Sequence, residues 1–321
     1  MKVFLYTTFA LVAFAFNSIL CRLALRGEEA DAAGFTTVRI VAGAVALIAI
    51  SYVVGRRVPR YRRPHVSKGN AMIPQHESHL ADANPAPPEP NVALTHVRAT
   101  DTRSTDTGSW ASACLLFAYA VCFSFAYLGL TAGTGALILF GAVQMTMVVA
   151  AIFKGERPVP VEWTGLVAAV CGLVYLVFPG LASPPLVSSV LMAAAGMSWG
   201  FYSIRGRSSG DPLVNTTGNF VRSLPFAAAF AILFLPNLHL TGRGVLYAVL
   251  SGSLTSGVGY TVWYAALKHH TQMRAAVLQL AVPVIAATGG ILFMAEAFTM
   301  RLLIAAVLIL GGIALTIFSR K

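Results

Sequence analysis

The sequence predicts an all-α polytopic membrane protein whose ten transmembrane helices are arranged as two inverted five-helix repeats. The composition, the spacing of the apolar runs and a match between the two halves of the chain predict this fold. The chain has 321 residues, of which 57% are hydrophobic and 11% are charged, and its mean hydropathy is +0.72. Soluble domains carry about 25% charged residues, so the length divides into membrane spans rather than soluble domains.

Apolar runs long enough to cross a bilayer, which takes about 20 residues, recur along the whole chain. The first run follows Lys2 and resembles a signal peptide, but because further apolar runs follow it we interpret it as a retained helix. The predicted helices span residues 3–25, 33–54, 110–130, 134–153, 161–178, 186–205, 213–235, 243–266, 274–295 and 299–318.

One connection, residues 56–108, is far longer than the others and is polar and proline-rich. It lacks the apolar surface needed to fold alone, so we expect a disordered cytoplasmic insertion. Its opening segment, Arg56–Lys68, holds six basic residues and no acidic one, a pattern that either binds anionic lipid or only fixes topology. His76 and His79 lie close together, but their spacing does not match a zinc protease motif, and we expect no metal site.

The net charge of +11 comes from basic residues that lie mostly at the ends of apolar runs. A nucleic-acid partner would need a basic face on a soluble fold, so none is expected. Cytoplasmic loops are enriched in Lys and Arg, and this bias predicts a multi-pass protein of the cell (inner) membrane with both termini in the cytoplasm. The four cysteines form no C-x-x-C pair and are interpreted as packing residues.

The two halves of the chain match each other at two offsets. Arg22 and Arg39 match Arg205 and Arg222 at a separation of 183 residues. At a separation of 140 residues the matches are Gly155-Glu156 with Ala295-Glu296, Gly172 with Gly312, and Phe178 with Phe318. The long polar connection lies between the two sets and accounts for the difference. We therefore expect a first repeat over 1–180 and a second over 181–321. An odd number of helices per repeat inserts the second upside down relative to the first, a recurrent build of secondary transporters.

Four further segments occur in a fixed order along the chain: Phe35-Thr36-Thr37-Val38-Arg39, Gly155-Glu156-Arg157-Pro158, Ser198-Trp199-Gly200-Phe201-Tyr202-Ser203, and Ala281-Val282-Pro283-Val284 followed by Glu296. In this order and spacing they resemble the EamA-type members of the drug/metabolite transporter superfamily. The resemblance covers nearly the whole chain outside 56–108. It implies ten short helices, two repeats and a cavity lined by the first, third, fourth, sixth, eighth and ninth of them.

Polar side chains inside a span are costly and therefore mark candidate sites. Arg39 and Arg222 both lie inside apolar runs, where an arginine either attracts an anionic group of a solute or bonds carbonyl groups and braces the bundle. By the family resemblance, further residues are expected to face the solute: Asn17, Gln144, Trp199, Tyr202, Tyr260, Trp263 and Gln279. The alternative for these residues is hydrogen bonding between helices and anchoring at the membrane surface.

Pro283 lies inside the ninth predicted helix, where it is either a hinge or a kink that improves packing. No carboxylate lies in the middle of a predicted span, so no coupling site for a proton or sodium ion is indicated. We expect no enzyme and no cofactor, because no nucleophile–base pair or metal-ligand set lies at depth.

The sequence therefore predicts a secondary transporter for a small metabolite, amino-acid-like or related, that works by export or exchange. The alternative is a membrane scaffold that uses its basic loop to bind a partner and transports nothing.

Overall fold

The computed structural model describes residues 2–57, 108–153, 155, 159–178, 183–207, 211–270 and 278–318. Within these ranges the chain consists of helices, short connections and one isolated antiparallel bridge between Ala30 and Leu240. The greater part of the predicted insertion, including the two histidines considered for metal binding and most of the basic cluster, lies outside the described residues.

Each predicted span contains a helix. In the first half these are α1 (Lys2–Arg26), α2 (Ala32–Arg57), α3 (Trp110–Ala126), α4 (Ala132–Phe153) and α5 (Pro160–Val177). The second half contains α6 (Leu186–Arg207), α7 (Pro212–Leu233), a short 3-10 turn η1 (Leu235–Asn237), an eighth span in three parts, α11 (Ala281–Met294) and α12 (Met300–Phe318). In the described ranges six of these spans are long and apolar enough by themselves to cross a membrane, and three further apolar helices are shorter.

The eighth span changes its winding halfway. It runs from α8 (Gly242–Leu250) through η2 (Ser251–Val258), a π-helix, into α9 (Gly259–Leu267). A π-helix is wider than an α-helix and usually marks a functional position. This segment reads Ser-Gly-Ser-Leu-Thr-Ser-Gly-Val, so the wide turn presents hydroxyl groups inside an otherwise apolar span.

The ninth span is interrupted just before α11. Leu280 forms a turn between the helical residues 278–279 and α11, and Pro283 lies in the first turn of α11. Proline has no N–H to donate to the carbonyl group four residues earlier, and its ring collides with that carbonyl, so Pro283 explains the interruption. Pro283 was expected further inside a continuous helix over 274–295; residues 271–277 are outside the described ranges.

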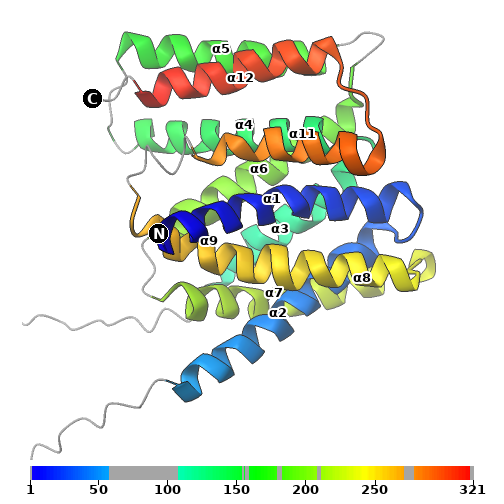
Figure 1. Cartoon of the computed structure of the whole chain (residues 1–321). Coiled ribbons are helices and arrows are strands. Elements are labelled where there is room, and N and C mark those ends of the chain that lie inside the picture. Colours follow the sequence, from blue (N-terminus) through cyan, green and yellow to red (C-terminus); the bar gives the residue numbers. More distant parts are fainter. Residues whose placement is uncertain are drawn as a thin grey trace, which may run out of the picture.

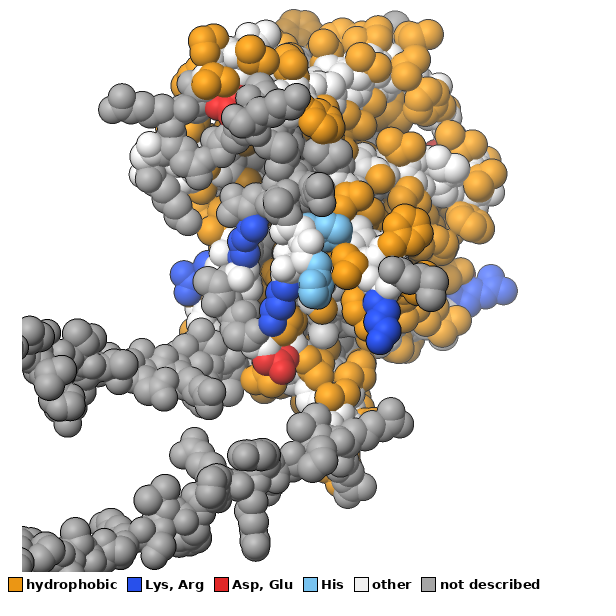
Figure 2. Space-filling view, turned by 60° about the vertical axis from the view of Figure 1, so that its left-hand side comes forward, with side chains coloured by type: hydrophobic (Ala, Val, Ile, Leu, Met, Phe, Trp, Pro, Cys, Tyr) orange, Lys and Arg blue, Asp and Glu red, His pale blue; other side chains and the backbone are white. Residues whose placement is uncertain are grey.

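The helices form layers (Figure 1). One outer layer consists of α5 and α12, and the next of α4 and α11. The centre holds α1, α3, α6 and α9, while α2, α7 and α8 cover the opposite side. The start of α1 and the end of α12 lie on the same side of the molecule, as do the end of α2 and the start of α3. Figure 2 shows this side, where basic and histidine side chains gather between hydrophobic surfaces.

Helices of the first half pack on helices of the second half. The pairs α2–α7, α4–α11 and α5–α12 each join matched helices, and α3 packs on α6 as α1 packs on α9 and η2. Two matched residues that precede the matched glutamates, Gly155 and Ala295, both have positive φ, +90° and +50°.

The side of the molecule opposite the two termini is held together by polar contacts between the halves. Arg22 at the end of α1 donates to Glu296, 3.2 Å away, and to the Tyr127 carbonyl oxygen at 2.9 Å. Glu296 also accepts from the backbone N–H of Ala132 at 2.8 Å, where it satisfies the first turn of α4. The loops 27–31 and 237–241 are joined there by the Ala30–Leu240 bridge.

Candidate solute site

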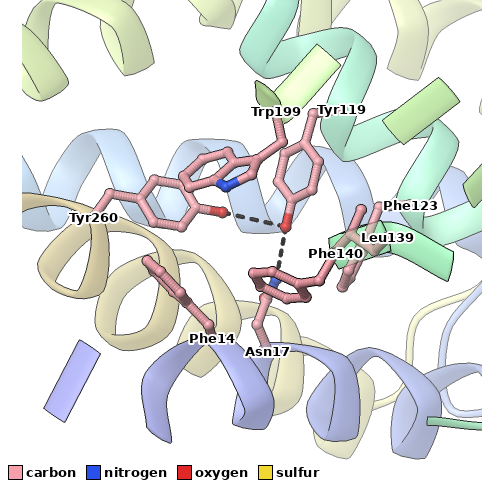
Figure 3. Close-up of a pocket in the computed structure, with 8 residues that line it drawn as sticks. All are labelled: Phe14, Asn17, Tyr119, Phe123, Leu139, Phe140, Trp199 and Tyr260. Carbon is pink, nitrogen blue, oxygen red and sulfur yellow. Dashed lines mark hydrogen bonds between the residues drawn. The ribbon is translucent and has the colours of Figure 1, made fainter. Parts of the chain in front are cut away.

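A small cavity lies at the centre of the bundle (Figure 3). Its walls come from α1, α3 and α4 of the first half and from α6 and α9 of the second. The lining residues are Phe14, Asn17, Tyr119, Phe123, Leu139, Phe140, Trp199 and Tyr260. Its volume is about 10 Å³, which is room for about one water molecule.

Aromatic rings close the cavity by contacting one another. The ring of Trp199 lies 4.4 Å from that of Tyr260 and 5.2 Å from that of Tyr119, measured between centroids. Phe14 approaches both Trp199 and Tyr260 edge-on, at 5.9 Å and 5.8 Å. Such rings supply a large apolar surface with few polar tips, which suits a solute of mixed character.

Arg39 lies directly behind this aromatic layer and is 2% exposed. Its guanidinium group donates to the hydroxyl groups of Tyr119 at 3.2 Å, Tyr260 at 3.0 Å and Ser256 at 3.1 Å. Its charge also lies over the rings of Tyr119 and Phe123, at 5.2 Å and 4.9 Å from their centroids. Every one of these partners is neutral, so the described residues place a buried cation beside the cavity without a carboxylate.

Asn17 connects the cavity to the π-helix. Its amide nitrogen donates to the Tyr119 hydroxyl at 3.1 Å. Its amide oxygen accepts from Ser251 at 2.6 Å and from Thr255 at 3.1 Å, both in η2. The wide turn of η2 thus brings hydroxyl groups to Asn17 and, through Ser256, to Arg39.

Glycine allows α2 and η2 to approach closely enough for these bonds. A Cβ atom at Gly252 would lie 2.8 Å from the carbonyl carbon of Arg39, and one at Gly43 would lie 3.0 Å from the carbonyl oxygen of Gly252. Close approach of backbones through small residues is the usual packing of membrane helices.

The structure brings some of the sequence-predicted residues together at the cavity. Asn17, Trp199 and Tyr260 line it, and Arg39 bonds two of the lining hydroxyl groups. Tyr202 and Trp263 lie one shell further out: the ring of Tyr202 is 5.4 Å from Trp199.

Trp263 packs edge-on against Phe14 at 5.7 Å. The Tyr202 hydroxyl accepts a hydrogen bond from Asn219 at 3.3 Å, which directs its polar tip toward α7.

Three predicted residues do not reach the cavity in this form. Gln144 in α4 and Gln279 before α11 are buried but are not among the lining residues. Arg222 is half-buried and donates to the Gly218 carbonyl of its own helix at 3.1 Å. The two arginines that match by the repeat therefore have different surroundings.

Several residues of the site were not singled out from the sequence, namely Tyr119, Phe14 and the η2 hydroxyl groups. Tyr119 looks like any other aromatic residue of an apolar helix. A signal for η2 existed, because five Ser, Thr and Gly residues stand within 251–256 of a predicted span. Polar residues that cluster in a span deserve the same scrutiny as charged ones.

Comparison with known proteins assigns the fold and the class. The model of the EamA-like transporter family matches residues 187–318. A Pseudomonas aeruginosa protein, named uncharacterized protein PA1977, is 40% identical over 319 residues, covering 99% of this chain and 96% of its own.

The chain belongs to the EamA-like transporter family. This confirms the predicted resemblance and the predicted class, a membrane transporter rather than an enzyme. It also agrees with the ten helical spans found in the described residues.

More distant relatives carry functional names. A Salmonella typhimurium protein named probable amino-acid metabolite efflux pump is 26% identical over 206 residues, covering 59% of this chain and 69% of its own. An Escherichia coli protein of the same name is 25% identical over 234 residues, covering 64% and 77%. A crystal structure of another protein, 18% identical, superposes with a TM-score of 0.58 over 97% of this chain and 94% of the other, which shows the fold alone.

Proposed function

We propose that the chain is a secondary transporter that moves a small organic solute, amino-acid-like or related, by export or exchange. The supporting observation is the closed cavity of about 10 Å³ at the centre, whose walls come from both halves of the chain. A transporter that alternates between two open forms passes through such a closed state, with the solute held where the repeats meet. The names of the two efflux-pump relatives favour export.

The predicted inverted repeat, 1–180 and 181–321, supplies the means of alternation. Because matched helices pack on each other across the halves, the contacts that one half makes can be exchanged for those of the other. We place Asn17, Trp199 and Tyr260 at the solute. Gln144 and Gln279 are buried polar groups in helices of opposite halves and are candidates for the open forms.

We further propose that the protein lies in the cell (inner) membrane with both termini in the cytoplasm. The start of α1 and the end of α12 lie on the same side, together with the ends of the helices that flank the basic insertion. On this orientation Arg56–Lys68 meets the anionic cytoplasmic leaflet.

Reconstituted protein tests the proposal. Liposomes loaded with unlabelled amino acids and related metabolites are expected to accumulate the labelled solute by counterflow, whereas protein-free liposomes are not. Absence of flux across a broad panel, from protein shown to be folded, contradicts the proposal. Deletion of residues 60–105 distinguishes a transporter from a scaffold. A transporter keeps its flux without the loop, whereas a scaffold loses its cellular role.

A further inference from the structure

The hydrogen bonds around Arg39 leave more donors than acceptors. A guanidinium group has five N–H donors and no acceptor. The Nε and one terminal nitrogen of Arg39 are used on three hydroxyl groups, while the other terminal nitrogen, Nη1, has no partner among the described residues. The side chain is 2% exposed, so water in the bulk does not satisfy it.

The two phenols add a further donor. Tyr119 and Tyr260 both accept from Arg39, and their hydroxyl oxygens are 3.4 Å apart. One phenolic proton is used between the two oxygens, and Asn17 also donates to Tyr119. The other phenolic proton therefore has no acceptor among the described residues of this cluster. Both phenols line the cavity, so this donor belongs to the cavity wall.

This cluster is rich in donors, positively charged and walled by apolar rings, and no anion among the described residues bonds it. Buried cations are normally paired, because an unpaired charge in a medium of low dielectric constant is costly. The described acidic residues that form ion pairs, Glu29 and Glu296, pair with Arg243 and Arg22 instead. The missing partner is therefore a group that comes and goes with the solute.

Resting on the proposed function, we infer that the solute carries a carboxylate, which binds the Tyr119–Tyr260–Asn17 cluster with Arg39 as its counter-charge. Arg39 is the only cation among the described residues that bonds this cluster, so a single carboxylate matches it. The rings of Phe14 and Trp199 receive the apolar body of the solute. Arg39 acts through the phenols and is a specificity-determining residue.

Replacing the carboxylate by a neutral amide tests the inference on the unmodified protein. Counterflow is measured with leucine, methionine, phenylalanine and 2-hydroxy-4-methylpentanoate, and each acid that exchanges is paired with its own primary carboxamide as an unlabelled competitor. Charge-assisted hydrogen bonds exceed neutral ones, so the amide is expected to compete at least about 10-fold more weakly than the acid.

Variants of Arg39 locate the origin of this preference. Arg39→Gln is expected to bring acid and amide within about 2-fold of each other, whereas Arg39→Lys keeps the charge and part of the preference. Arg301→Gln is the matched control, since Arg301 donates to the Tyr175 carbonyl oxygen in the outer layer, and it keeps the full preference.

Several outcomes overturn the inference. Equal competition by acid and amide in the unmodified protein contradicts the inference but not the proposed transport. The same holds for an Arg39→Gln protein that exchanges solute and still prefers the acid to the amide. Exchange of solutes that lack a carboxylate, without exchange of any acid, contradicts the inference alone, whereas absence of flux across the broad panel contradicts the proposed function as well. If Arg39→Gln does not fold, Tyr119→Phe, which removes one phenolic donor, is expected to reduce the preference, and an unchanged ratio contradicts the inference.

Discussion

The surroundings of Arg39 determine what this buried arginine can do. An arginine that lies seven residues into α2 is roughly 10 Å from the start of the helix, at a rise of about 1.5 Å per residue. At that depth it needs acceptors, and it finds them in Tyr119, Tyr260 and Ser256 of three other elements. Its repeat partner Arg222 donates to the Gly218 carbonyl oxygen of its own helix. The same residue at matched positions therefore serves different purposes.

A second arginine, Arg22, makes a testable contribution to stability. It pairs with Glu296, whose side chain is 7% exposed and also accepts from the first N–H of α4. Glu296→Ala leaves both donors without their acceptor, so the free energy of unfolding is expected to fall by about 2–4 kcal/mol. Unfolding in detergent by heat or denaturant measures this change.

The control for this prediction is the other ion pair. Arg243 and Glu29 are 3.8 Å apart, and the Arg243 side chain is 79% exposed. Exposed pairs contribute about 0–1 kcal/mol, so Arg243→Ala is expected to have little effect. An equal decrease in the free energy of unfolding for both variants would contradict the prediction that the buried Glu296 contributes more than the exposed pair.

The sequence reveals polar residues at depth but not their partners. Arg39 and Arg222 could not be distinguished beforehand, because the repeat places both at the same position. Asn17, Trp199 and Tyr260 were expected at the cavity from the family resemblance, and the structure places them on its wall. Tyr119 was missed because its role depends on three donors that come from α1, α2 and α9. Such convergence is tertiary information that no local pattern carries.

At the scale of the element, the contact between α2 and η2 depends on glycine. A Cβ atom at Gly252 would meet the backbone of Arg39 at 2.8 Å, and backbone atoms cannot move aside as a flexible side chain does. Gly252→Ala is therefore expected to lower the free energy of unfolding by at least about 3 kcal/mol and to abolish exchange. Thermal unfolding and counterflow measure the two effects.

Gly311 provides the comparison in an outer helix. A Cβ atom there would meet no heavy atom within 4 Å. Gly311→Ala is expected to leave stability unchanged or slightly higher, because alanine favours the helix by about 1 kcal/mol. A Gly252→Ala protein as stable as Gly311→Ala would contradict the close contact.

The interruption before α11 leads to a prediction about the rate of solute exchange. Pro283→Ala restores an N–H that can bond the Gln279 carbonyl, so the helix is expected to close across Leu280. If Pro283 is a hinge, solute exchange slows while stability is kept or raised. Counterflow half-times and amide hydrogen exchange over 278–284 report on this.

Pro225 inside α7 is the control, because α7 continues from Pro212 to Leu233 through this proline without a break. Pro225→Ala is expected to leave the exchange rate unchanged. An unchanged rate for Pro283→Ala, with protection of the amides gained, would assign the proline to packing alone.

The sequence predicted where the helices lie, but it did not predict how the eighth and ninth spans are wound or where they break. Length and apolarity located a helix in every predicted span, because the bilayer fixes both. The break at Leu280 follows from one proline, and the π-wound η2 packs on α2. Neither feature has a counterpart in the matched helices of the first half, because α3 (Trp110–Ala126) and α4 (Ala132–Phe153) are each one continuous α-helix.

At the scale of the whole molecule, the closed cavity and the joined outer loops describe one state of a cycle. Loops 27–31 and 237–241 belong to opposite halves, and they meet on the side away from the termini. If the halves move relative to each other during transport, these loops separate in the form that opens on this side.

A disulfide across the loops tests whether such separation is needed. Ala30 and Leu240 are bridge partners flanked by the bonds from Asp31 to His239 and from Thr241 to Glu29, so they form a non-hydrogen-bonded pair. Such pairs have Cα atoms about 4.5 Å apart, within the range that a disulfide accepts. Oxidised Ala30→Cys/Leu240→Cys protein is expected to lose counterflow at least about 10-fold and to recover it on reduction. Each single cysteine variant, treated identically, keeps its flux. Full flux with the bond quantitatively formed would show that solute passes without separation of these loops, and the opening on this side would then have to lie elsewhere, at the Arg22–Glu296 contact.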